Sequence, residues 1–260
     1  MCAGSPVKSL GDAISSDQEE RERPTISEPD LSGVPLDRLE DMAAAGAEVI
    51  DCMRVLAKTE DNVVGEALRD GGVFYELSHY PDGDIYDPTS HAQFYYHAHR
   101  PGEHGHFHTF LREDGMPEGV APAVLPGDHA PEDEDDTICH LIGFSMDKYG
   151  VPIGLFTTNL WLTGDTWYAA DAVCQMIDLF EIDLARPSWP LNRWISKMFP
   201  LFRPQMIALL HERDEKIAAW AAQHPDIDVY EDRDLDIVSY IPVSIDDQVA
   251  AVARALTKAA

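Results

Sequence analysis

The sequence predicts an α+β protein in which an antiparallel β-meander or partial barrel forms the core and helices pack at the N- and C-terminal ends. Two observations lead to this expectation. Apolar residues recur every three or four positions towards both ends of the chain, which indicates amphipathic helices. Short apolar runs separated by Gly, Pro and Asp fill the middle, which is typical of antiparallel strands joined by turns.

One domain is expected from residue 34 to residue 260, because a chain of 260 residues can bury a substantial core. Residues 1–33 are polar, charged and poor in large apolar side chains, so we expect a disordered N-terminal tail. Residues 114–136 are rich in Pro, Gly and acids and contain no Lys or Arg, which predicts a mobile acidic loop. Residues 164–224 are expected to form a layer of helices.

The first elements after the tail are two helices and a strand. Apolar side chains step by three and four from residue 36 to residue 56, and a second helix is expected over residues 61–69, ended by Gly71 and Gly72. Residues 73–77 favour a strand, and residues 80–91 a turn-rich connection.

Residues 93–113 predict a β-hairpin that carries five of the eleven histidines within twelve residues. If Arg100 pairs with Gly105, residues 101–104 form the turn, His99 faces His106, and His97 faces His108. Because side chains alternate along a strand, these four rings then share one face. A slip of one residue would separate them onto opposite faces.

Imidazole is the commonest metal-ligating side chain, so the hairpin predicts a metal site. The expected ligands are His97, His99, His106 and His108. Glu103 is the candidate fourth ligand or general base, and His104 beside it is a second candidate catalytic residue. The competing interpretation is a solvated or stacked histidine face, or buried histidines that hydrogen-bond to carboxylates.

Part of this stretch resembles the first motif of the cupin superfamily, in which His-X-His followed by Glu holds a metal inside a β-barrel. His97, His99 and Glu103 match that fragment. The flanking glycines of the motif are absent near Ala92 and Phe110, and residues 125–129 are the nearest candidate for the second motif, with a different spacing. The resemblance implies ligand roles for the three matching residues.

A second hairpin is expected from two apolar runs, residues 137–147 and 151–161, that flank residues 148–150. His140 on the first run could add a ligand or support one. Asn159 lies where the second run meets a helix capped by Thr163 or Asp165, and is a third candidate catalytic residue. Further elements are a helix from residue 203 or 204 to residue 222, a strand over residues 234–244 and a helix from residue 245 to about residue 257.

Composition restricts the partners. The net charge of −28 opposes binding to nucleic acid or to anionic membranes. The four cysteines form no CxxC pair, and no apolar run is long enough for a signal peptide or a membrane span, so we expect a cytoplasmic protein. The sequence is also compatible with a homo-oligomer.

These features favour a metal-dependent enzyme that acts on a small molecule. Iron is slightly preferred, as in a non-haem iron oxygenase, because a carboxylate and aromatic side chains accompany the histidines. Zinc would instead indicate a hydrolase or lyase, and copper is the third divalent metal considered. A non-catalytic module for metal binding or sensing, or a structural interaction domain, would also be compatible with these residues.

Overall fold

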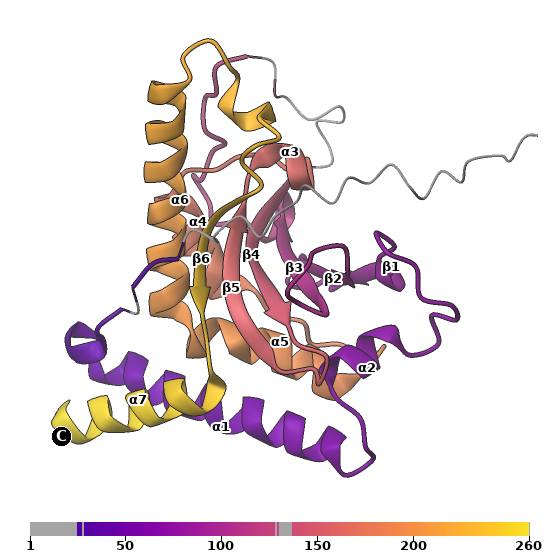
Figure 1. Cartoon of the computed structure of the whole chain (residues 1–260). Helices are drawn as coiled ribbons and strands as arrows, with labels where there is room; N and C mark the ends of the chain where they lie inside the picture. The colour runs from indigo at the N-terminus through magenta and orange to yellow at the C-terminus, as the bar shows by residue number, and fades with distance from the viewer. Residues whose placement is uncertain (1–24, 28, 128, 130–136, 260) are drawn as a thin grey trace, which may run out of the picture.

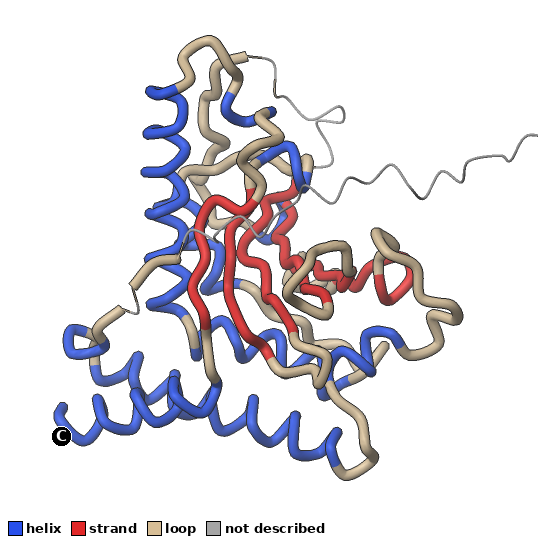
Figure 2. Tube along the Cα trace, viewed as in Figure 1, coloured by secondary structure: helices blue, strands red, loops and turns tan. Residues whose placement is uncertain are grey.

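The computed structural model describes residues 25–27, 29–127, 129 and 137–259. It confirms the α+β class, with a six-stranded antiparallel sheet whose strands follow one another in the order of the sequence (Figures 1 and 2). Within the described residues, the first and last strands do not pair, so the sheet is an open meander and not a barrel. The strands are β1 (Tyr80–Tyr86), β2 (Ala92–His97), β3 (Gly105–Arg112), β4 (Ile138–Met146), β5 (Pro152–Thr158) and β6 (Ile237–Pro242).

The described helices flank this meander at both ends of the chain and between β5 and β6. In Figure 1, α6 stands beside β6, while α1 and α7 lie against each other below the sheet. The α-helices are α1 (Leu36–Ala57), α2 (Val63–Leu68), α3 (Leu160–Thr163), α4 (Ala170–Met176), α5 (Trp189–Leu201), α6 (Arg203–Gln223) and α7 (Ile245–Ala259).

The sheet has two different faces because successive side chains of a strand point to opposite sides. One face packs on the helices and forms the main core, in which the rings of Phe107 and Phe144 lie 5.9 and 6.2 Å from the fully buried Trp194 of α5. The other we call the histidine face. It carries Tyr95, His97, His106, His108, Phe110, His140 and Phe156.

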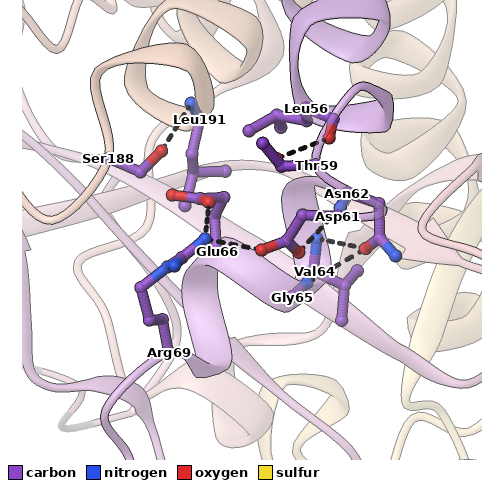
Figure 3. Close-up of polar contacts among 10 residues, drawn as sticks. All are labelled: Leu56, Thr59, Asp61, Asn62, Val64, Gly65, Glu66, Arg69, Ser188 and Leu191. Atoms are coloured by element: carbon purple, nitrogen blue, oxygen red, sulfur yellow. Dashed lines mark hydrogen bonds and ion pairs between the residues drawn. The ribbon is translucent and has the colours of Figure 1, made fainter.

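Local side-chain bonds fix the helix starts near the turn before α2 (Figure 3). The side-chain oxygen of Asn62 accepts hydrogen bonds from the backbone N–H groups of Val64 and Gly65, both at 3.0 Å. These are donors that a helix start leaves without an intrahelical partner. In the same view, Ser188 caps α5 by accepting from the backbone N–H of Leu191 at 3.4 Å.

The expected strand over residues 73–77 is wrong. That segment is an irregular loop with Val73, Tyr75 and Leu77 exposed, and Leu77 has a positive φ of 67°. The strand forms instead at Tyr80–Tyr86, within the stretch that the sequence predicts to be a turn-rich connection. It is an edge strand with an irregular register. An edge strand pairs with a neighbour on one side only, so it tolerates Pro81, which has no backbone N–H to donate.

The second hairpin, the last strand and the last helix agree with expectation. β4 and β5 flank the turn at residues 147–151, and Ser244 caps α7 by accepting from the backbone N–H of Asp247 at 3.2 Å. The expected cap at Thr163 or Asp165 is wrong, since α4 begins at Ala170, whose N–H donates to Asp214 at 2.6 Å.

Parts of the expected tail and loop lie outside the described residues, namely residues 1–24 and 28 of the tail and residues 128 and 130–136 of the loop. At the described end of the tail, Thr25 forms a β-bridge with Tyr240 of β6, and Leu31–Gly33 form a short 3-10 helix. In the loop, Ala123 donates to the backbone of Trp167 at 2.9 Å. No helix of the described part combines the length and the apolar character that crossing a membrane requires.

Candidate metal centre

Three buried histidines from two neighbouring strands converge on the histidine face. His97 ends β2, and His106 and His108 lie on β3. One ring nitrogen of each lies within 4.8 Å of those of the other two. His106 and His108 are completely buried and His97 is 8% exposed, so the three rings could hold one metal ion in a site shielded from solvent.

The pairing register brings these rings together in a different way from the expected one. His97 pairs with His106, and Tyr95 pairs with His108, so the register is shifted by two residues. The connection between the strands is the seven-residue loop 98–104 instead of a four-residue turn. Because the shift is even, every side chain keeps its face, and the cluster survives the error in register.

Hydrogen bonds determine how His97 and His106 are oriented. Glu103 Oε1 lies 2.6 Å from His106 Nδ1, and both side chains are fully buried. A carboxylate can only accept, so Nδ1 of His106 carries the proton and its Nε2 presents a lone pair. His97 Nε2 lies 2.6 Å from Nε2 of His106 and is therefore the donor of the hydrogen bond between the two rings.

A second chain of hydrogen bonds supports His108. Its Nδ1 lies 2.9 Å from Nε2 of His140 on β4, and Nδ1 of His140 lies 3.3 Å from the hydroxyl of Thr158 on β5. This chain does not involve Nε2 of His108. Within the described structure, neither that atom nor Nδ1 of His97 has a hydrogen-bond partner, although both are buried. Buried polar atoms are usually paired, so two unpaired ring nitrogens are consistent with a site that binds a ligand.

His140 reaches the histidine face because β4 contains a bulge. Between His108 and Phe110 two steps of β3 are matched by three steps of β4, from Gly143 to His140. The extra residue reverses the side to which His140 points. Asp165 holds the bulged end by accepting from the backbone N–H of His140 at 2.7 Å.

Burial keeps these histidines neutral. Desolvation lowers the pKa of His97 and of His140 to about 3, and holds the pKa values of His106 and His108 well below the ordinary value. Desolvation also lowers the pKa of the half-buried His99, to about 4. Neutral imidazole is the form that binds a metal.

The remaining predicted residues occupy different positions. The ring of His99 lies 4.8 Å from that of His97 and 5.0 Å from that of His106, at the edge of the cluster and outside the group of three. His104 is exposed and its Nδ1 bonds at 2.7 Å to the hydroxyl of Tyr96, whose strand position belongs to the opposite face. The structure does not bring His104 to the cluster.

Asn159 is not brought to the cluster either. Its amide nitrogen donates to the carbonyl of Val229 at 2.7 Å, and its oxygen accepts from the N–H of Leu160 at 2.9 Å as the cap of α3. Both polar atoms of the side chain are therefore used within the fold.

The sequence predicts aromatic side chains beside the histidines, but it does not predict which of them form the walls of the site. The ring of Phe156 meets His106 and His108 edge-on at 5.5 and 5.7 Å, and the ring of His79 stacks on Tyr95 at 3.6 Å. A Cβ atom at Gly143 would lie 2.2 Å from Phe156, so only glycine leaves room for that wall. Gly143 and Phe156 pair across adjacent strands and carry no recognisable sequence pattern, so no local signal could have found them.

Comparison with known proteins gives one match. A family described as a domain of unknown function (DUF6969) matches residues 43–243, which include the whole sheet and the histidine cluster. No curated protein and no solved structure matches the chain significantly.

Proposed function

The chain belongs to the DUF6969 family, and we propose that it is a metal-dependent enzyme in which His97, His106 and His108 hold one divalent transition-metal ion. The observation that carries the proposal is the outer layer of hydrogen bonds. Glu103 binds Nδ1 of His106, and His140 binds Nδ1 of His108, so both rings keep Nε2 for a metal ion. Metal-ligating histidines typically use such partners to fix the ring and its tautomer.

The geometry of the cluster is close to that of a metal site. Zinc–nitrogen bonds of 2.0–2.1 Å in a tetrahedral site place two ligand nitrogens roughly 3.3 Å apart. The Nε2 atoms of His97 and His106 lie 2.6 Å apart and share a proton, so both rings need to separate slightly as that hydrogen bond is lost. His97 stays neutral if its proton moves to Nδ1, which lies unpaired.

Three imidazoles favour a hydrolase or lyase that uses zinc. The carboxylate of Glu103 is occupied by His106, which removes it from the direct ligand set and weakens the argument for iron. Zinc held by three histidines lowers the pKa of a bound water to about 7 and so supplies a nucleophile at neutral pH. In this chain, Glu103 orients a ligand instead of acting as the general base.

An iron oxygenase acting on an apolar molecule is the second candidate. It is favoured by the aromatic surroundings, in which Phe156, Tyr95 and Phe110 all border the histidines. Imidazole suits iron as well as zinc, so three histidines are also compatible with iron.

Metal content is the first test. Protein without a histidine tag, purified with and without oxygen, is analysed for zinc, iron and copper as wild type, His106→Ala and His211→Ala. His211 lies half-exposed on α6 and serves as the matched control. We expect one metal per chain in the wild type and in the control, and none in His106→Ala. Equal metal content in all three proteins, or none in the wild type, would reject the site.

A second test separates an enzyme from a closed metal-binding module. Cobalt(II) replaces the native metal, and azide is added while the visible spectrum is recorded for the wild type and for His99→Ala. An open coordination position predicts that azide changes the wild-type spectrum. A response only in His99→Ala would show that His99 fills the fourth position, and this would favour metal storage or sensing over catalysis.

A further inference from the structure

Tyr95 lies on the histidine face and contacts two of the three proposed metal ligands. It pairs directly with His108 across β2 and β3, and its ring centre lies 5.2 Å from those of both His97 and His108. The ring of His79 stacks on it at 3.6 Å, with an angle of 7° between the two ring planes. These contacts hold the phenol ring beside the cluster.

The hydroxyl of Tyr95 is left over by the fold. Although the residue is only 8% exposed, its hydroxyl forms no hydrogen bond with any residue that the structure describes. The next residue provides a contrast, because the hydroxyl of Tyr96, on the opposite face, bonds to Nδ1 of His104 at 2.7 Å. Burial raises the pKa of Tyr95, so its hydroxyl keeps the proton at neutral pH and can donate it to an acceptor in a hydrogen bond.

The place of Tyr95 in the sheet suits a contact with a ligand of the metal. His97, His106 and His108 all rise from one face of the sheet, so a further ligand would approach from the side away from the strands. Tyrosine is longer than histidine. We therefore expect a phenol that stands among these rings to carry its hydroxyl beyond their nitrogens, towards that side. A neutral O–H donor there would stabilise negative charge on the ligand.

We propose that the hydroxyl of Tyr95 donates a hydrogen bond to an anionic ligand at the open coordination position of the metal, an inference that rests on the metal site proposed above. The matching class of substrate is a carbonyl compound, such as an ester or an amide, whose oxygen becomes negatively charged during hydrolysis. The metal ion and the hydroxyl would share the stabilisation of that charge. Tyr95 is then a binding residue for what the metal binds, and not a ligand of the metal itself.

The test uses Tyr95→Phe, which removes the hydroxyl and keeps the ring, with Tyr96→Phe as the matched control on the opposite face. Azide, formate and imidazole are titrated into the cobalt(II)-substituted full-length proteins while the visible spectrum is recorded. Azide and formate are anions that accept hydrogen bonds, whereas imidazole bound to a metal is neutral and keeps only an N–H donor. We expect Tyr95→Phe to bind both anions about tenfold or more weakly than the wild type, because a hydrogen bond to a charged group is lost, with imidazole affinity unchanged. Tyr96→Phe should match the wild type with all three probes.

Equal affinities of the wild type and Tyr95→Phe for both anions would overturn the inference and leave the metal site standing. An equal loss of affinity for all three probes would mean that the variant disturbs the metal ligands, and would also overturn it. A wild type that responds to none of the probes would reject the open metal site and the inference with it.

Thermal unfolding of the metal-free proteins gives a check that does not depend on the metal. Tyr96→Phe loses a hydrogen bond to His104 and should lower the Tm, whereas Tyr95→Phe loses none and should leave the Tm unchanged. A lower Tm in Tyr95→Phe would show that the hydroxyl is already used within the fold, contrary to the proposal.

Discussion

Replacing Glu103 with glutamine tests whether the buried carboxylate supports metal binding through His106. Glu103 Oε1 lies 2.6 Å from His106 Nδ1, and neither side chain is exposed, so solvent does not screen this contact. Glutamine keeps an oxygen acceptor at similar length but removes the negative charge. Loss of such an outer partner typically weakens metal binding by about 10- to 100-fold, or about 1.4–2.7 kcal/mol.

The assay is a competition titration of zinc between the protein and a chromophoric chelator. Glu103→Gln is compared with the wild type and with Glu118→Gln, which removes an exposed carboxylate from the loop after β3. Thermal unfolding of each metal-free protein checks that the fold is retained. Unchanged zinc affinity in Glu103→Gln, combined with loss of zinc in His106→Ala, would refute the argument that the carboxylate supports the ligand.

Three further predictions concern the fold around the site. Burial lowers the pKa of His97 and His140 to about 3 from 6.5, so the unfolded chain binds more protons between these pH values. The histidines therefore contribute fully to the free energy of unfolding of the metal-free protein above pH 6.5, and this contribution is lost as the pH drops towards 3. The loss is about 1.4 kcal/mol per pH unit for each ring. Urea unfolding at several pH values should show this slope. Gly143→Ala would place a Cβ 2.2 Å from the ring of Phe156. Zinc titration should therefore show weaker zinc binding, and thermal unfolding should show lower stability. Unchanged zinc affinity and stability would mean that the ring of Phe156 is not held rigidly. Asn62→Ala removes two hydrogen bonds at the start of α2 and should cost about 1 kcal/mol in urea unfolding, with zinc affinity unchanged.

The faces of the sheet could be predicted from the sequence, but its register could not. Alternation alone puts His97, His106 and His108 on one side, and that expectation is confirmed. The register depends on the loop 98–104, where His104 donates its backbone N–H to Met146 of β4 at 2.8 Å. Such a contact with a distant strand is invisible to reasoning about a local turn.

The misplaced first strand has a similar cause. Residues 73–77 contain strand-forming side chains, but Gly72 and Leu77 have positive φ angles and the segment has no strand partner within the described structure. Residues 80–86 contain Pro81 and Gly83, which local propensity disfavours in a strand. Pairing with β2 overrides that propensity, because tertiary contacts outweigh weak local preferences.

His140 shows the same limitation at the site. Regular alternation would place it on the helix-covered face, and the sequence of β4 gives no sign of the bulge. Its role beside His108 depends on pairing across three strands, from the ring of His108 to the hydroxyl of Thr158.

The bulge in β4 depends on chain length, and not only on side-chain chemistry. Deleting one residue between His140 and Gly143 would change no charged group and no member of the cluster. The spacing from His140 to Gly143 would then match the two steps of β3, so regular alternation would keep His140 on the histidine face without a bulge. A protein engineer could therefore remove the bulge by shortening the strand by one residue, while His140 keeps its place beside His108 and the three clustered histidines keep their own strands.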